Sequence, residues 1–397
     1  MSLLKSLYEK DLYPEIADAG QSDFARDCVE IAATRLARGE IDRRTFMKAL
    51  TALGALPAAV TLAGRPAGAA AGEVVVVNWG GPAVEAYTKA FGVPFEKATG
   101  VKVVIDGTGP LGSKIKAMVD AKAVTWDVCD TGTGTTLVLQ KQGVIQKIDY
   151  GIVDKSKMQE MFAYEYGCAN YMFSFILAYN KTKVPSAPTG WKDFWDLARF
   201  PGNRTLRKQP NGMLEACMMA AGRSPKEVYP IDIDLAVGKL KEIKANVIAW
   251  GSGSQSQELF RTGEVVMGNI WHTRANLLNQ ETGGDVTWTW QDGIVTAGMW
   301  NVPNGNPAGT ETAMKFIASS QDPEQQLVLF DAMGNGPANP AAAAKVPADK
   351  KYIDPGQPEN LALQVLQNGP WYEEDSGTRN LTNDELSREK WLDALSS

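Results

Sequence analysis

The chain is 397 residues long and carries 40 basic and 46 acidic side chains, which gives a formal net charge of −6 at pH 7. This acidic balance, without a basic patch, argues against binding to nucleic acid or to an anionic membrane surface. The single histidine excludes a metal site with several histidine ligands and leaves carbonyl chemistry with one candidate base.

An export signal is predicted near the N-terminus. Arg43 and Arg44, with Phe46 and Lys48 downstream, are typical of the twin-arginine signal of bacteria. The uncharged apolar run at 49–64 that follows is too short to span a bilayer comfortably. A cytoplasmic amphipathic helix that happens to carry paired arginines is the alternative.

Small residues complete this signal, because A-x-A cleavage sites end at Ala69 and at Ala71. The order of charge, apolar run and cleavage site predicts an N-terminal extension at 1–42 and a twin-arginine signal peptide at 43–71. We therefore expect the twin-arginine export machinery as a partner. The mature protein is expected to work in the periplasm.

Alternating strands and helices open the mature chain. Strands are predicted at 73–79, 101–105 and 126–130. One helix lies between the first two strands and ends at Gly100, and another is predicted at 114–123. This alternation is typical of an α/β fold with a mostly parallel sheet.

The second half of the mature chain continues the α/β pattern. The predicted elements are, in order, a strand at 171–180, helices at 191–200, 212–222 and 234–245, strands at 247–250, 265–271 and 285–290, a further apolar strand at 293–303, helices at 311–319 and 323–333, and a C-terminal helical segment that ends at 391–392. The strand at 293–303 is expected to return the chain to the first sheet. Two lobes joined by more than one crossing are therefore predicted, lobe 1 at 73–176 plus 297–344 and lobe 2 at 177–296 plus 345–397.

Small polar loops follow the first three predicted strands. They contain Gly80-Gly81, Gly107–Gly112 and Thr131–Thr136, at the strand ends where open α/β sheets bind ligands. Gly107–Gly112 formally matches the dinucleotide fingerprint G-x-G-x-x-G, but it follows the second strand and Pro110 stiffens the turn. We therefore expect these loops to bind a small solute and predict no cofactor.

Tryptophan marks the predicted edge of a cleft. Trp79 and Trp271 each end an apolar strand where a polar loop begins, so their rings are expected to stack on a ligand or to hold a cation. His272, next to Trp271, is expected to contact ligand or structure rather than to catalyse. The carboxylate groups at Asp232, Asp234 and 373–375 are expected to be solvated, and we predict no catalytic residue and no metal ligand.

Several segments together resemble type II solute-binding proteins of ABC importers, of the spermidine/putrescine-binding kind. These segments are Val77–Trp79, Phe95–Val103, Trp126–Val128, Gln142–Asp149, Met267–Trp271 and Gly293–Pro303. The resemblance covers nearly all of the mature chain and implies a two-lobed Venus-flytrap, which closes on a small-molecule solute and delivers it to an ABC permease in the inner membrane. No bond is made or broken, so we predict no enzymatic activity, and we expect a monomer.

Matched residue by residue, the resemblance implies ligand contacts from both lobes. The predicted site residues are Trp79, Gly80, Thr108, Gly109, Thr131, Gly132, Thr133, Arg207, Asn211, Trp271, His272, Arg274 and Gly298.

Departures from the polyamine-binding pattern indicate a different ligand. Polyamine binders hold ammonium groups with acidic side chains at positions that carry Gly212 and Gly298 here, and burial of an ammonium without a carboxylate is costly. Arg207 and Arg274 lie near the presumed cleft, and the guanidinium group of arginine binds carboxylates through paired hydrogen bonds. The hypothesis is a small solute with an anionic group, such as a γ-amino acid or another carboxylate.

Three alternatives remain. The first is a spermidine/putrescine binder proper. The second is a ferric-iron binder of the same fold, which would need paired tyrosines from among Tyr164, Tyr166 and Tyr171. The third, of a different class, is a periplasmic enzyme that carries a cofactor, although no cofactor motif supports it.

Overall fold

The computed structural model describes residues 72–396, which all belong to one compact unit, Gly68–Ser397. The predicted N-terminal extension and signal peptide, at 1–71, lie outside the described residues. Within 72–396, no helix combines the length and the hydropathy needed to cross a membrane.

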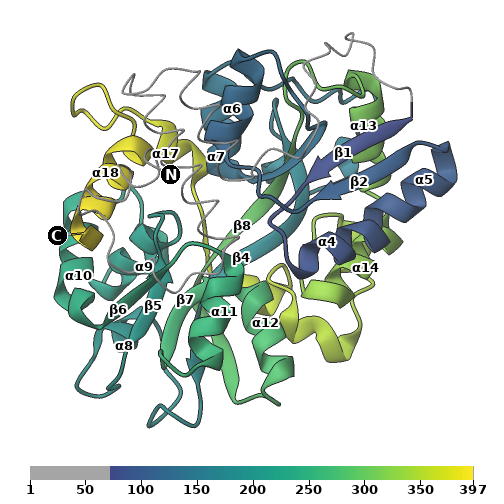
Figure 1. Cartoon of the computed structure of the whole chain (residues 1–397). Helices are drawn as coiled ribbons and strands as arrows, with labels where there is room; N and C mark the ends of the chain where they lie inside the picture. Colours follow the sequence, from purple (N-terminus) through teal and green to yellow (C-terminus); the bar gives the residue numbers. More distant parts are fainter. Residues whose placement is uncertain (1–71, 397) are drawn as a thin grey trace, which may run out of the picture. The chain divides into compact units, whose positions relative to one another are not determined.

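Three parallel strands form one end of the sheet (Figure 1): β1 (Glu73–Val77) lies between β2 (Lys102–Asp106) and β3 (Val128–Gly132). Three of the four valines of β1 are fully buried, as expected for a strand covered on both faces. The helices at this end are α4 (Pro82–Tyr87), α5 (Val93–Thr99), α6 (Gly112–Asp120), α7 (Thr133–Lys141), α13 (Thr310–Ser319) and α14 (Pro323–Met333). The predicted first helix is found as α4 and α5 joined by a π-helical turn, and Gly100 ends it with a φ of 75°.

Two long antiparallel strands join this end to the rest of the sheet. These are β4 (Cys168–Asn180) and β8 (Val286–Asn301), and β8 lies between β3 and β4. The prediction of separate strands at 285–290 and 293–303 is wrong, because β8 is continuous. The chain passes through Asp292 at a φ of 60°, and the pairing with β4 shifts register nearby, so a local irregularity replaces the expected break.

The other end of the sheet is built around β5 (Arg204–Arg207), which lies parallel to β6 (Val247–Trp250) and β7 (Met267–Trp271). Because β7 pairs antiparallel with β4, the whole sheet is mixed and has the order β2-β1-β3-β8-β4-β7-β5-β6. The helices at this end are α8 (Trp191–Trp195), α9 (Met213–Ala220), α10 (Ile233–Ile243), α11 (Gly253–Arg261), α12 (His272–Glu281), α17 (Gly369–Glu373) and α18 (Asn383–Ser396). The short elements α15 (Pro340–Ala343), α16 (Pro358–Leu361), β9 (Gly336–Pro337) and β10 (Val365–Leu366) complete the chain, with β9 paired to β4 and β10 to β8.

The helix predicted at 191–200 is wrong in length, because α8 ends at Trp195. The fully buried Arg204 side chain donates hydrogen bonds to the carbonyl oxygens of Phe194 and Phe200. These carbonyls are therefore satisfied by a guanidinium rather than by a continued helix.

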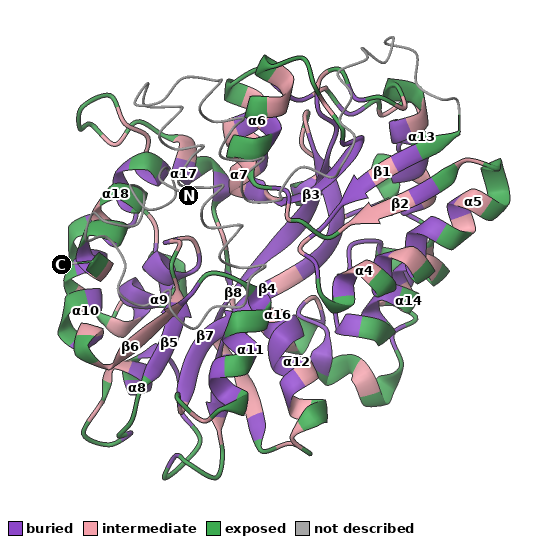
Figure 2. Ribbon diagram, viewed as in Figure 1, coloured by how far each residue is buried: buried purple, intermediate pink, exposed green. Residues whose placement is uncertain are grey.

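Two large apolar cores lie toward the two ends of the sheet. In the first, Tyr87, Phe91 and Trp300 meet edge to face with ring centroids 5.4–6.0 Å apart, and each such pair contributes about 0.5–1.5 kcal/mol beyond area burial. The second packs α8, α9, α10 and α18 around Trp191 and Trp391. Between them, most of β4 and residues 293–301 of β8 are buried (Figure 2). The predicted lobe boundaries at 176/177 and 296/297 fall inside these two strands, and the one at 344/345 follows α15. The division into these lobes stays a prediction.

Candidate ligand-binding cavity

A cavity of about 740 Å³ opens where several strands end. Its lining includes Trp79 after β1, Thr131 and Gly132 at the end of β3, Arg207 at the end of β5 and Trp271 at the end of β7. This volume is in the range of small-molecule sites. The strand ends expected to bind a ligand in an open α/β sheet thus converge on one cavity.

The two tryptophans predicted at the cleft edge lie together at this cavity. The ring centroids of Trp79 and Trp271 are 6.2 Å apart, with 57° between the ring planes. Trp271 also packs edge to face on Trp250 and on Phe173. Since Trp79 follows β1 and Trp271 ends β7, elements from both ends of the sheet meet here. Stacking of these rings on a ligand stays a prediction.

Arg207 is partly buried and enclosed by aromatic rings. The centre of its guanidinium lies 5.5–5.8 Å from the ring centroids of Phe175, Trp250 and Trp271. Burial, and then the charge of Arg388, lower the pKa of the Arg207 guanidinium to about 10. No residue of the described part of the chain forms an ion pair with Arg207, so its charge is free to meet an anion in the cavity.

Arg274 is 3% exposed and also lines the cavity. Its Nε and Nη1 atoms have no hydrogen-bond partner among the described residues. Burial lowers the pKa of Arg274, and the nearby Tyr171 opposes this shift. Two unpaired donors on a buried guanidinium are costly, so this side chain is suited to a ligand that accepts hydrogen bonds and carries negative charge.

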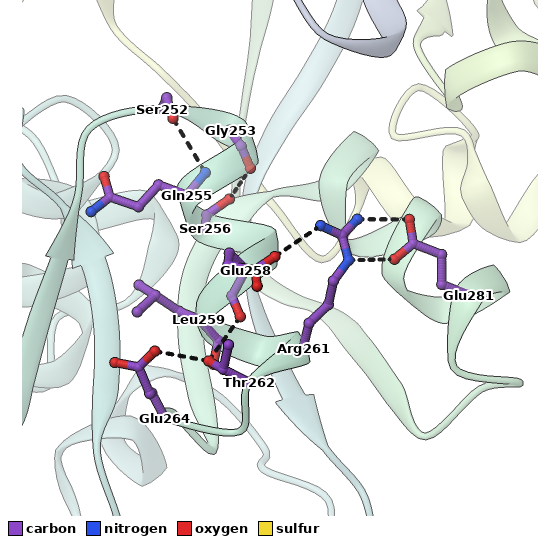
Figure 3. A network of polar contacts seen from close by, with 10 residues as sticks. All are labelled: Ser252, Gly253, Gln255, Ser256, Glu258, Leu259, Arg261, Thr262, Glu264 and Glu281. Atoms are coloured by element: carbon purple, nitrogen blue, oxygen red, sulfur yellow. Dashed lines mark hydrogen bonds and ion pairs between the residues drawn. The ribbon is translucent and has the colours of Figure 1, made fainter. Parts of the chain in front are cut away.

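The position of Arg274 depends on two helices that lie side by side. Arg274 is in the first turn of α12, and the start of α11 packs against it. Figure 3 shows how α11 is held: the Ser252 hydroxyl accepts the Gln255 N–H at its start, and Arg261 at its end makes two 2.8 Å hydrogen bonds to Glu281 of α12. The helices are thus fastened at their far end, while Thr273 and Arg274 in the first turn of α12 line the cavity.

Asp130 is a cavity residue that the sequence analysis missed. It lies in β3, is 1% exposed, and its Oδ2 accepts hydrogen bonds from Tyr87 at 2.8 Å and from Tyr171 at 3.2 Å. Asn170 donates in turn to the Tyr87 hydroxyl at 3.1 Å. Burial raises the pKa of the Asp130 carboxyl to about 7, although both tyrosine hydroxyls oppose the shift. An acidic residue inside an apolar strand, just before a cleft loop, was the available signal.

The loop after β3 contributes polar groups at the start of α7. Thr131 hydrogen-bonds through its hydroxyl to Asn301 and Thr136, whereas the buried Thr133 hydroxyl has no partner among the described residues. Gly134, at the start of α7, lies close to Asn211. Thr131, Gly132, Thr133 and Asn211 therefore all border the cavity, as does Thr296.

Four predicted residues near the first two loops and on β8 do not line the cavity. Gly80, at a φ of 70°, packs against the backbone of the loop that holds Gly109, and a Cβ there would lie 2.5 Å from a carbonyl oxygen. Thr108 is exposed, and its hydroxyl accepts from Lys114. Gly298 is covered by Tyr171, whose ring lies 2.4 Å from where a Cβ would be. These glycines serve close packing.

His272 does not line the cavity either, although its neighbours Trp271, Thr273 and Arg274 do. It is fully buried, its Nδ1 accepts the Ser174 N–H at 3.0 Å, and its Nε2 donates to the Gly334 carbonyl at 2.7 Å. Burial lowers the pKa of His272 to about 4. Both ring nitrogens are used inside the fold, so this histidine is a structural group.

The three tyrosines from which a ferric-iron site would need a pair do not lie together. Tyr171 lines the cavity, whereas Tyr164 and Tyr166 pack in separate apolar clusters. Among residues 72–396, no three or more His, Cys, Asp or Glu side chains gather as a metal site would require.

Comparison with known proteins identifies a family. The sequence model described as "Bacterial extracellular solute-binding protein" matches residues 90–355. The Gamma-aminobutyric acid-binding protein of Pseudomonas aeruginosa is 30% identical over 297 residues, which cover 73% of this chain and 83% of that protein. The Spermidine/putrescine-binding periplasmic protein of Escherichia coli is 24% identical over 294 residues, which cover 70% and 81%.

A solved structure extends the likeness to the fold. The ABC transporter substrate-binding protein from Bradyrhizobium japonicum has a TM-score of 0.75 and 33% identity over 82% of this chain and 99% of that chain. These similarities confirm the predicted resemblance and the α/β two-lobed fold.

Proposed function

This chain belongs to the bacterial extracellular solute-binding protein family, and we propose that it captures a small solute that carries a carboxylate, foremost an ω-amino acid. As a family member it is the solute-binding component of an ABC transporter, and its partners are a small-molecule solute and an ABC permease.

The observation that carries this proposal is the pair of guanidinium groups at the cavity. Neither Arg207 nor Arg274 has a carboxylate partner among the described residues, and Arg274 keeps two buried donors unused. A ligand carboxylate would supply charge and acceptors together, in the planar geometry that arginine matches. The printed name of the Pseudomonas relative gives its ligand as γ-aminobutyric acid, which has such a carboxylate.

Eight of the predicted residues are retained in the proposed site. They are Trp79, Thr131, Gly132, Thr133, Arg207, Asn211, Trp271 and Arg274, all of which line the cavity. Ligand held between Trp79 and Trp271, from the two predicted lobes, would stabilise the closed state only when the cavity is occupied.

A polyamine is the weaker candidate, although the Escherichia coli relative is named for polyamines. Where polyamine binders carry acidic residues, the rings of Phe175 and Tyr171 lie 2.4 Å from the Cβ positions of Gly212 and Gly298. An acidic side chain therefore has no room at either position while those rings stay in place.

The proposal also covers compartment and assembly. We infer export through the twin-arginine signal at 43–71, action in the periplasm as a monomer, and no enzymatic activity. Replacement of Arg43 and Arg44 by lysine should retain the protein in the cytoplasm, whereas the unchanged protein should be recovered from the periplasmic fraction. If the variant and the unchanged protein are found in the periplasmic fraction in equal amounts, the export proposal is contradicted.

The ligand proposal is tested by calorimetric titration of the purified protein. The ligands are 4-aminobutyrate, 5-aminopentanoate, succinate, putrescine and spermidine. We expect an ω-amino acid to bind most tightly. Tight putrescine binding without binding of any carboxylate would overturn the proposal. A thermal-shift screen supports the titration, because a ligand at 100 times its dissociation constant adds about 2.7 kcal/mol to stability.

A further inference from the structure

Asp130 is a buried carboxylate whose hydrogen bonds are one-sided. Its Oδ2 accepts from the hydroxyls of Tyr87 and Tyr171, whereas its Oδ1 has no partner among the described residues. A carboxylate offers acceptor positions on both oxygens. The side chain borders the cavity, so a ligand donor can complete what the protein leaves open.

No cation of the described part of the chain forms an ion pair with Asp130. Tyr87 and Tyr171 provide hydrogen bonds but no charge, and burial raises the pKa of both phenols well above the usual value, so they stay neutral. A buried carboxylate without a counter-ion is costly. The missing partner therefore has two properties, an N–H donor and a positive charge.

The same cavity presents positive charge as well. Tyr171, which donates to Asp130, lines this cavity together with Arg274. Asp130 and Arg274 thus line the same cavity, one suited to a cation and the other to an anion. This arrangement complements a zwitterion with separated ends.

We propose that Asp130 binds the ammonium group of the ligand and gives the site its preference for amino acids over carboxylates that lack an amine. This inference rests on the proposed function, in which Arg207 and Arg274 hold the carboxylate. In this arrangement the ammonium group of the ligand donates an N–H hydrogen bond to the carboxylate of Asp130. Aromatic rings such as Trp79, which hold any cation, are the alternative.

The test is a calorimetric comparison of three matched ligands on the full chain: 4-aminobutyrate, 4-hydroxybutyrate and 4-(trimethylammonio)butyrate. The hydroxy acid lacks the charge, and the trimethylated acid keeps the charge but lacks N–H donors. We expect the amino acid to bind at least about 30-fold more tightly than either analogue, which corresponds to one lost buried charge contact. Equal binding of the trimethylated acid would overturn the inference in favour of the aromatic rings.

The variant Asp130→Asn gives a second readout. The introduced amide would keep an acceptor for the tyrosine hydroxyls and a similar volume, so the fold is expected to survive. We expect the variant to bind 4-aminobutyrate at least about 30-fold more weakly, with 4-hydroxybutyrate changed less than about threefold. Equal loss for both ligands would identify a structural role and overturn the inference.

The two proposals fail in different ways. If the unchanged protein binds no carboxylate at all, the proposed function falls and this inference falls with it. If it binds amino and hydroxy acids equally well, the arginine proposal stands and the role of Asp130 alone is overturned. Because the ligand series on the unchanged protein decides this point, the result does not depend on the folding of the variant.

Discussion

Gly253 and Arg274 are packed so closely that a β-carbon on the glycine would lie 2.5 Å from the arginine Nε. The same added carbon would lie 3.1 Å from the ring of Trp271. Glycine at the first position of α11 therefore makes room for a cavity arginine, although Gly253 itself does not line the cavity. A small residue at a helix start can thus determine where a charged side chain on another helix lies.

Gly253→Ala should displace Arg274 and weaken carboxylate binding by about tenfold or more, since misplacement of a buried charged donor costs at least about 1–2 kcal/mol. Gly238→Ala is the matched control, because Gly238 lies inside α10 with nothing within 4 Å of its added carbon. It should raise stability by about 0.5–1 kcal/mol without a change in affinity. Equal affinities for the two variants, measured by titration calorimetry, would disprove this positioning of Arg274.

Arg274→Met should act on binding and stability in opposite directions. Affinity for a carboxylate ligand is expected to fall by at least about 30-fold, because the ligand would lose its buried charge partner. The ligand-free protein should melt at a higher temperature, because a buried guanidinium with unpaired donors is replaced by an apolar chain of similar length. Arg199→Gln, at a half-exposed surface arginine, serves as the control and should leave affinity unchanged.

The buried His272 should stay neutral in mildly acidic solution. Burial lowers its pKa from 6.5 to about 4. Between these two pH values, the imidazole is therefore protonated in the unfolded chain and neutral in the folded chain. Stability is therefore lost as pH falls from 6.5 toward 4, by up to roughly 3 kcal/mol. As the chain has one histidine, NMR of its imidazole reports the pKa directly. Titration near 6.5 would show that the ring is not buried as described.

Binding of an amino acid should strengthen as pH rises from about 6 to about 8. Burial raises the pKa of Asp130 to about 7, so at about pH 6 roughly a tenth of the empty sites carry the anion that an ammonium needs. The pKa values of the groups that face it, Tyr87 and Tyr171, and of the adjacent Cys129 are raised well above this range. Affinity for 4-aminobutyrate should be roughly tenfold lower at about pH 6 than at about pH 8, and Asp130→Asn should remove this dependence. If the affinity of the unchanged protein for 4-aminobutyrate does not change with pH, this dependence on the charge of Asp130 is contradicted.

Local pattern was sufficient for much of the fold. The valine run of β1 was predicted as a strand, and Gly100 as the end of the following helix, because both depend on short-range geometry. The rule that ligands bind at strand ends placed Trp79 and Trp271 at one cavity.

Tertiary packing decided the rest. His272 lies within two residues of three cavity residues in the sequence, yet it points into the fold, since successive residues at a helix start face different directions. Asp130 was missed because its partners, Tyr87 and Tyr171, are far from it in the sequence and meet it only in the folded chain. No periodicity reports such a contact.

The ring of Tyr171 above Gly298 limits how this protein could be redesigned or could diverge. A lone exchange of that glycine for aspartate, aimed at converting the specificity toward diamines, would drive the ring away and break its bond to Asp130. The aromatic residue would first have to be replaced by a smaller one, so at least two coordinated changes separate the proposed carboxylate specificity from a diamine specificity.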